Sequence, residues 1–293
     1  VEPARAFLAN RNTVKKQYEK QREELQNKWP EVKPLAVGDF TAFSPYAFLH
    51  RRVKKWYPSQ EQKQSAVLSL PYKKNSSFIH QKKDIRVSSV YTYIKKPAYY
   101  AIFNSGEKAV DRQRLGIGLL WTPKAGIILQ GQTGTDDEAW GTYDKKLTEA
   151  QNLSADFSIN GKKINPGVGN RNLGNGILQI SYKLADNGDK SILFKDHKIS
   201  VNIKSSGKFT EYLPFVIKED DKIRVQSNKI IINKNNQNIV VNYPEDSDIK
   251  THTEKLPAYE EKQLWVRLEK PKQYILKVYA ISARHKLNYQ IEF

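Results

Sequence analysis

Side chains suited to binding sugars are concentrated between residues 89 and 142. Tyrosine and tryptophan offer flat apolar faces with polar edges, and arginine and glutamine offer paired hydrogen-bond donors. The aromatic members are Tyr91, Tyr93, Tyr99, Tyr100, Trp121 and Trp140, and the donors are Arg112, Arg114, Gln130 and Gln132. Turn sequences interrupt the short apolar runs, which is typical of antiparallel strands; they are Asn104-Ser-Gly106, Thr122-Pro-Lys-Ala-Gly126 and Gln132-Thr-Gly-Thr135. This region therefore predicts a β-sheet with a saccharide-binding face.

The same residue types could support elimination chemistry on polymers of uronic acid. Such an enzyme neutralises the uronate carboxylate, removes the acidified C5 proton and protonates the leaving O4; tyrosine and histidine are suitable acid–base groups. The catalytic candidates are His80, Tyr91 and Tyr93, and the substrate-binding candidates are Tyr46, His50, Arg51, Arg112 and Trp121. Alternate tyrosines on a strand also pack against neighbouring elements, so each tyrosine has a purely structural interpretation as well.

Other chemistries have weaker support in the sequence. None of the five histidines has the i, i+4 spacing of a zinc site. The acidic runs at 136–138 and 219–221 are predicted to lie in turns, whereas a hydrolase needs two carboxyl groups facing each other across a cleft. We expect neither a metal nor a cofactor.

The chain is strongly basic, with 49 Lys and Arg against 31 Asp and Glu and a net charge of +18 over 293 residues. Such a surplus favours an anionic partner: an acidic polysaccharide, nucleic acid or anionic lipid. The lysines are spread along the chain beside many asparagines and isoleucines, which also fits a general compositional bias. With no recognised nucleic-acid motif and no run of about 18 apolar residues, we expect neither nucleic-acid binding nor a membrane span.

The sequence contains no cysteine and no methionine. Disulfides, thiol nucleophiles and cysteine-bound metals are thereby excluded. A primary translation product begins with methionine, so we interpret the chain as a processed or excised piece.

The pattern along the chain predicts a mainly β protein, a large antiparallel multi-sheet β-sandwich preceded by a short α-helical segment. The helical segment spans residues 1–75, with one helix over 1–30 ending at Trp29-Pro30 and a second over 59–69 capped by Ser59 and Gln62. The sandwich spans 76–293. Its strands are expected at 84–94, 98–104, 114–121, 126–131, 155–159, 176–184, 190–194, 198–204, 209–217, 222–226, 229–233, 238–242, 263–268 and 273–282, with a loop over 244–262.

Three features together resemble the heparinase II/III-like polysaccharide lyases: the helical piece closing with Trp29-Pro30, and the β segments Tyr-Tyr-Ala-Ile-Phe-Asn-Ser-Gly (99–106) and Arg-Leu-Gly-Ile-Gly-Leu-Leu-Trp-Thr-Pro (114–123). Those proteins join an α/α-toroid to a C-terminal β-supersandwich. The resemblance implies that this chain is the last toroid helices plus the sandwich.

The resemblance also implies a function: the C-terminal portion of a bacterial, periplasmic or secreted lyase that cleaves an acidic glycan, such as a glycosaminoglycan, by metal-independent β-elimination. The family's histidine-rich segment on an early strand has no match, because residues 84–121 contain no histidine and His80 is the nearest. A non-catalytic carbohydrate-binding or structural β-sandwich is the alternative, in which the same aromatic side chains stack on sugars without chemistry.

Overall fold

A computed structural model describes residues 20, 23, 24, 27, 59–108, 113–131, 139–145, 148–149, 152–185, 188–218, 220–255 and 275–293. The chain divides into two compact units, residues 1–69 with 261–267 and residues 70–260 with 268–293. Helix α5 (Gln60–Ser69) belongs to one unit, and all the other elements below belong to the second.

Helix α5 begins with a reciprocal pair of capping hydrogen bonds. The Ser59 amide donates to Gln62 Oε1 (2.8 Å), and the Gln62 amide donates to Ser59 Oγ (3.1 Å). These bonds satisfy two amides at the start of the helix, which confirms the predicted cap. In the helix predicted over 1–30, the four described residues, at 20, 23, 24 and 27, are helical, and the others lie outside the described residues.

The second unit starts with the short helix α6 (Pro71–Lys74) and continues as antiparallel strands. The strands described are β1 (Phe78–Asp84), β2 (Ser89–Lys95), β3 (Tyr100–Glu107), β4 (Gly116–Thr122), β5 (Gly126–Gln130), β6 (Gly141–Tyr143), β7 (Asn152–Leu153), β8 (Ala155–Ile159), β9 (Lys162–Ile164), β10 (Gly169–Asn172), β11 (Leu178–Leu184), β12 (Gly188–Phe194), β13 (Lys198–Ile217), β14 (Lys222–Gln226), β15 (Lys229–Lys234), β16 (Gln237–Asn242), β17 (Asp248–Lys255) and β18 (Ile275–Glu292). The predicted fold class, a large antiparallel β-sandwich preceded by a short helical segment, is confirmed.

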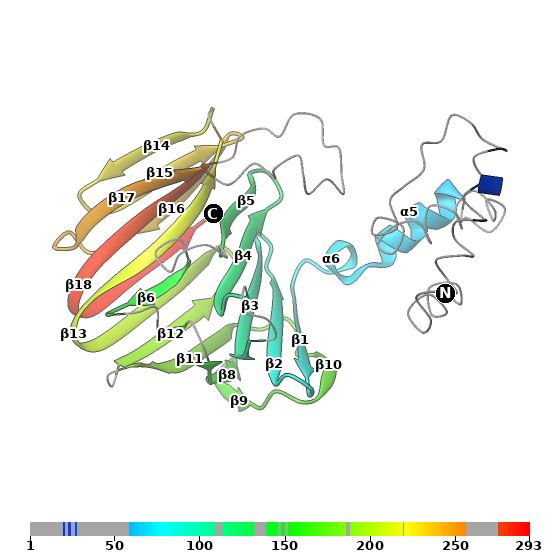
Figure 1. The fold of residues 1–293 in the computed structure, drawn as a ribbon, viewed down its shortest axis with the longest axis horizontal. Helices are drawn as coiled ribbons and strands as arrows, with labels where there is room; N and C mark the ends of the chain where they lie inside the picture. Colours follow the sequence, from blue (N-terminus) through cyan, green and yellow to red (C-terminus); the bar gives the residue numbers. More distant parts are fainter. Residues whose placement is uncertain are drawn as a thin grey trace. The chain divides into compact units, whose positions relative to one another are not determined.

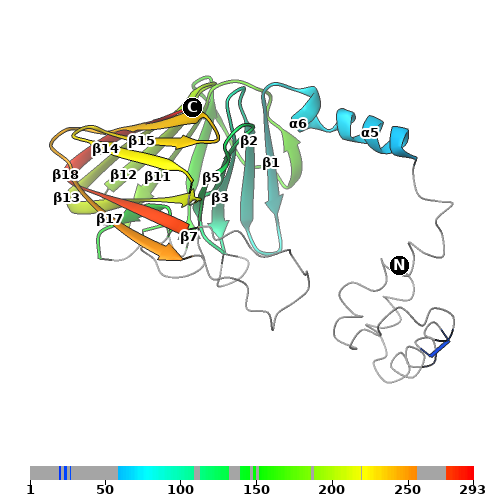
Figure 2. The ribbon, with the colours of Figure 1, turned by 90° about the horizontal axis from the view of Figure 1, so that it is seen from above.

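The strands form two layers joined by two long strands (Figures 1 and 2). The first layer runs β10-β1-β2-β3-β4-β5, and β5 contacts the second half of β13 through the Phe215–Leu129 pair. The second layer runs β9-β8-β11-β12-β13-β18-β16-β15-β14. The pairing of β13 with β18 is irregular near the middle of both strands. Its register shifts between Lys204 and Lys208 of β13, and His285 on β18 has a positive φ angle of 66°.

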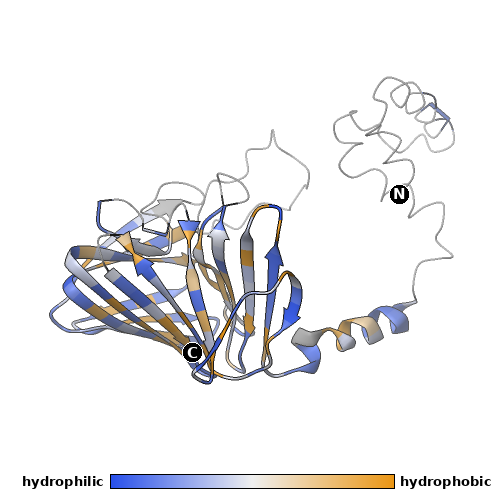
Figure 3. Ribbon diagram, turned by 90° about the horizontal axis from the view of Figure 1, so that it is seen from below, coloured by the Kyte–Doolittle hydropathy of each residue, from blue (hydrophilic) through white to orange (hydrophobic). Residues whose placement is uncertain are grey.

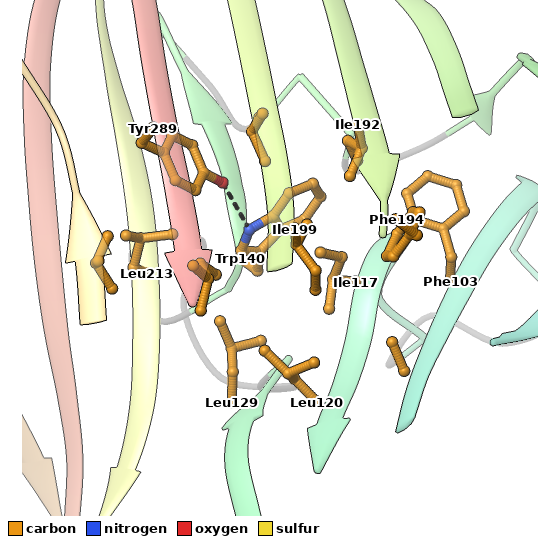
Figure 4. Close-up of a cluster of buried hydrophobic side chains, with 14 of the residues drawn as sticks. Phe103, Ile117, Leu120, Leu129, Trp140, Ile192, Phe194, Ile199, Leu213 and Tyr289 are labelled. Atoms are coloured by element: carbon orange, nitrogen blue, oxygen red, sulfur yellow. Dashed lines mark hydrogen bonds between the residues drawn. The ribbon is translucent and has the colours of Figure 1, made fainter. Parts of the chain in front are cut away.

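The core lies between the two layers because alternate residues of each strand point inward. The ribbon in Figure 3 shows this alternation as hydrophilic and hydrophobic residues along the same strand. Phe103 and Ile117 of the first layer and Phe194 and Ile199 of the second are fully buried in one cluster, drawn in Figure 4. A second, smaller cluster of Val216, Leu276 and Val278 is buried on the opposite side of the β13–β18 pair.

A charged cluster is buried inside this core. Lys190 Nζ lies 2.9 Å from both Glu149 Oε1 and Glu211 Oε1, and all three side chains have no exposed surface. The ammonium also lies 3.8 Å from the centre of the Trp140 ring. Isolated ions would be very costly here, so the mutual pairing is what makes their burial tolerable.

Two buried tyrosines complete the cluster. Tyr289 donates its hydroxyl hydrogen to Glu211 Oε1 (2.7 Å), and Tyr182 donates to Glu149 Oε1 (3.1 Å). Burial, followed by the nearby carboxylates, raises the pKa of both phenols, so they remain donors. Nothing in the sequence pattern pointed to this arrangement.

Three predictions of local structure were wrong. A single strand was expected over 84–94, but the structure has the β1–β2 hairpin, with a turn in which the Arg86 amide donates to Asp84 Oδ1 (3.0 Å) and Ser88 adopts φ of 50°. Asn104-Ser-Gly106 was read as a turn, but these residues lie within β3. The polar run of β17 was assigned to a loop, although pairing with β18 makes it a strand, so pairing here overrides local propensity.

Two long strands also exceeded their predicted limits. The strands expected over 198–204 and 209–217 are one strand, β13, and the strand expected over 273–282 continues to Glu292 as β18. The strand predicted over 263–268 lies outside the described residues.

Candidate functional site: the aromatic face

The outer face of strands β1–β4 gathers aromatic side chains from four strands. Its residues alternate with buried ones along each strand, as the burial of β1, β2 and β3 shows. We call this surface the aromatic face. It consists of Phe78, His80, Lys82, Tyr91, Tyr93, Lys95, Tyr100, Ile102, Asn104, Leu119 and Trp121.

Cross-strand register arranges these residues in three rows. The central row pairs His80 with Tyr93, then Ile102 and Leu119. Direct cross-strand partners place their Cβ atoms about 4.5–5.5 Å apart, so the side chains of a row are neighbours. The His80 and Tyr93 rings have centroids 6.3 Å apart and planes inclined by 39°.

The second row brings Phe78, Lys95, Tyr100 and Trp121 together. The rings of Phe78 and Tyr100 have centroids 6.4 Å apart. Trp121 is 38% exposed, which is unusual for so large an apolar side chain. A flat, accessible ring at the edge of an aromatic row is suited to stacking on a sugar.

The third row contains Lys82, Tyr91 and Asn104. Asn104 Nδ2 donates to the carbonyl of Arg114 (3.3 Å), whereas Asn104 Oδ1 is buried with no partner within the described residues. The space for this amide depends on Gly118, where a Cβ atom would lie 2.9 Å from Asn104 Nδ2. A buried acceptor without a partner costs about 1–3 kcal/mol, so Asn104 Oδ1 destabilises this end of the aromatic face rather than offering an accessible acceptor.

Two phenols of this face, those of Tyr93 and Tyr100, favour their protonated form. Burial raises the pKa of Tyr93, and the neighbouring Tyr91 adds to the rise. Burial, with a further contribution from Tyr93, raises the pKa of Tyr100 to about 12. At neutral pH these hydroxyls are hydrogen-bond donors and proton sources rather than bases.

Two lysines flank the rings. Lys82 is exposed at one side of the face, and Lys95 is partly buried at the other. Burial, and then the ammonium of Lys73, lowers the pKa of Lys95. Because the residues of the aromatic face include no carboxylate, its charge is positive.

The structure brings together only part of the predicted site. His80, Tyr91, Tyr93 and Trp121 share the aromatic face. The other predicted substrate-binding residues, Tyr46, His50, Arg51 and Arg112, lie outside the described residues.

Two aromatic residues of the predicted sugar-binding region belong to the core instead. Tyr99 is 1% exposed and donates its hydroxyl to the carbonyl of Lys195 (2.9 Å). Trp140 is also 1% exposed and donates Nε1–H to Tyr289 (3.2 Å). Phe78 and Asn104 were missed, although the alternation of β1 and β3 would have placed both on the outer face once the hairpin was known.

The described residues contain no group of three or more His, Cys, Asp or Glu side chains that could hold a metal ion. No helix among them is long and apolar enough to cross a membrane.

Comparison with known proteins gives similarities of fold only. The chain matches no protein-family model and no curated protein. Its structure is similar to that of heparan sulfate lyase HepC from Pedobacter heparinus (TM-score 0.40, 10% identity, 88% of this chain and 42% of that chain). It is also similar to a heparinase III (0.39, 11%, 74% and 34%) and to 4-alpha-glucanotransferase from Thermococcus litoralis (0.37, 8%, 74% and 38%). The chain spans less than half the length of each of these three proteins.

Proposed function

We propose that this chain is part of a polysaccharide lyase-like protein that binds an acidic, uronic-acid-containing glycan across the aromatic face. The observation that carries the proposal is the register of β1–β4, which places His80 beside Tyr93 and Tyr100 beside Trp121 on one outer surface. Such a glycan is an extracellular polymer, so we place the protein in the periplasm or outside the cell.

The aromatic face offers each group that binding needs. Sugar rings present apolar C–H faces, which the rings of Tyr100 and Trp121 can cover. Lys82 and Lys95 supply positive charge for carboxylate or sulfate groups.

The residues also suit β-elimination without a metal. His80 accepts the C5 proton of the uronate, the C4–O4 bond breaks as the C4–C5 double bond forms, and Tyr93 donates its proton to the departing O4. The raised pKa of Tyr93 supports the acid role. Tyr91 lies diagonally from His80, about 7–8 Å away on the same face, where it can bind the sugar or replace Tyr93 as the acid.

The test is the ultraviolet absorbance of unsaturated uronate after incubation with heparin, heparan sulfate, hyaluronan, chondroitin sulfate, alginate or pectate. His80→Ala and Tyr93→Phe should each lower the rate about 100-fold or more, as expected for loss of an acid–base group. The matched controls His197→Ala and Tyr143→Phe lie off the aromatic face and should keep the full rate. A wild-type rate in both His80→Ala and Tyr93→Phe would refute the catalytic assignment.

Binding without chemistry is the second candidate. It is favoured by the exposed ring of Trp121 beside Tyr100, which can stack on a sugar without any proton transfer. In that case the glycan is retained by the protein, no unsaturated product forms, and Trp121→Ala weakens the retention.

A further inference from the structure

The outer face of the second layer contains a hollow lined by short polar side chains. Its volume is about 620 Å³, within the range of ligand sites in proteins. We call this hollow the polar groove. The residues that line it are Gln179, Ser191, Leu193, Ser200, Val201, Asn202, Asn242, Tyr243, Asn288, Tyr289 and Gln290.

Register aligns the lining across four strands. Ser191 of β12 is opposite Asn202 of β13, which is opposite Asn288 of β18. The next row runs from Leu193 to Ser200, then Gln290, then Asn242 of β16. Neighbouring side chains in each row are about 4.5–5.5 Å apart at Cβ, so the rows form a continuous polar floor.

The polar floor carries no charged side chain, although the chain is rich in lysine. The outward positions of the first half of β13 are Lys198, Ser200, Asn202 and Lys204, so two lysines bracket two short polar residues. None of the residues lining the polar groove is charged. The groove is therefore neutral in a chain whose net charge is +18.

Some polar side chains of the floor already have partners: Gln179 Nε2 donates to Ser181 Oγ (3.2 Å), and Gln290 Oε1 accepts from Lys198 Nζ (3.4 Å). Three others are available to a ligand. Neither Ser200 nor Asn202 nor Asn288 makes a side-chain hydrogen bond to any residue that the structure describes. Amides and hydroxyls both donate and accept hydrogen bonds. Leu193 provides an apolar spot between Gln179 and Ser200.

A second hollow of about 670 Å³ adjoins the groove and shares Ser191 and Asn202 with it. It extends the surface toward Asp156 of β8. Lys183 and Asp189 in this hollow neutralise each other through a 2.7 Å contact. Lys204 also lines this second hollow, so the second hollow is charged whereas the polar groove is not.

We infer that the polar groove binds a neutral oligosaccharide. The hydroxyl groups of such a ligand donate and accept, as do the Ser, Asn and Gln side chains of the floor, and its C–H groups can cover Leu193. A sulfated or uronic chain would find no cation among the lining residues of the groove. The groove is on the outer face of the second layer and the aromatic face is on that of the first, so the inference does not depend on the proposed function.

The experiment is a calorimetric titration of the whole chain with cellohexaose, xylohexaose, mannohexaose and maltohexaose, with a heparin hexasaccharide in parallel. At least one neutral hexasaccharide should bind with millimolar affinity or better. Asn202→Ala combined with Asn288→Ala should weaken that binding at least tenfold. Asn233→Ala, on the outer face of β15 in the same layer but outside the groove, is the matched control and should leave binding unchanged.

Three results would overturn the inference. They are the absence of binding by all four neutral hexasaccharides at millimolar concentration, unchanged affinity in the Asn202→Ala, Asn288→Ala variant, and loss of neutral binding in Trp121→Ala instead. Heparin binding that depends on Trp121 and not on Asn202 would support the aromatic face separately, so the two proposals fail independently. Unchanged melting temperatures would show that the variants are folded.

Discussion

The imidazole ring of His80 and the phenol ring of Tyr93 lie side by side on adjacent strands, with centroids 6.3 Å apart. The β1–β2 hairpin sets this relationship, because its register makes the two residues direct partners. Both side chains are on the outer face of the β1–β2 hairpin and are half-buried. Strand pairing thus holds a potential base beside a potential acid.

The two tryptophans should separate binding from stability. Trp121→Ala removes a partly exposed ring from the aromatic face, so acidic-glycan affinity should fall about tenfold, equivalent to about 1.4 kcal/mol, with little change in unfolding. Trp140→Ala empties a core position and should cost about 3–5 kcal/mol of stability. Glycan titration and urea unfolding measure the two effects; a large loss of stability in Trp121→Ala would contradict the surface role.

Lys190→Met should strongly destabilise the protein. The substitution leaves Glu149 and Glu211 buried without their shared cation, and breaking such a pair costs about 3–5 kcal/mol. Lys183→Met is the matched control, because Lys183 pairs with Asp189 at the exposed surface, where an ion pair contributes about 0–1 kcal/mol. Urea denaturation of both variants tests this, and equal stabilities would show that the buried pairing contributes nothing.

The free energy of unfolding should decrease as the pH rises above 4.5, because Glu211 loses its proton. Burial, opposed by Lys190, raises its pKa above the ordinary value of 4.5, so the folded state binds the proton more tightly than the unfolded state. The stabilisation that this proton contributes is therefore fully present below pH 4.5. It is lost as the pH rises through the pKa of Glu211 in the folded state.

Urea midpoints measured across this pH range should show a smaller decrease in Glu211→Gln than in the wild type. Glu245→Gln, on the surface loop after β16, should retain the wild-type slope. If Glu211→Gln also has the wild-type slope, another group is responsible.

Two glycines with positive φ angles allow the cost of a steric clash with Trp140 to be measured apart from the cost of backbone strain. At Gly116 a Cβ atom would lie 2.5 Å from Cζ3 of Trp140, whereas at Gly126 it would meet nothing within 4 Å. Their φ angles are 86° and 72°, so alanine is similarly strained at both. Gly116→Ala should therefore be less stable than Gly126→Ala by about 1–3 kcal/mol, the usual cost of overpacking, and similar melting temperatures would contradict the Trp140 contact.

Sequence patterns predicted the architecture well where turns carry strong local signals. Asn160-Gly161 and the Asn235-Asn236 hairpin have positive φ angles at the expected turns, and β8 and β14 begin and end at the predicted residues. The β1–β2 turn was missed because Ile85, Arg86 and Val87 resemble strand residues, and only the Asp84 cap and the positive φ of Ser88 mark it.

The sequence could predict which types of residue form the candidate site, but not which individual residues lie on the aromatic face. Composition identified His80, Tyr91, Tyr93 and Trp121, yet Tyr99 is just as aromatic and lies in the core. Which tyrosines face outward depends on strand phase, and a one-residue change in phase exchanges the two faces. The pairing of Lys190 with Glu149 and Glu211 depends on contacts between distant segments, which no local pattern encodes.

The most direct test of the central claim is oxidative footprinting of tyrosine and tryptophan side chains with and without heparan sulfate. We predict that the glycan protects Tyr91, Tyr93, Tyr100 and Trp121, while Tyr143, which lies off the aromatic face, is modified equally in both samples. Protection confined to other residues, or none at saturating glycan, would contradict the assignment of the aromatic face as the glycan-binding surface.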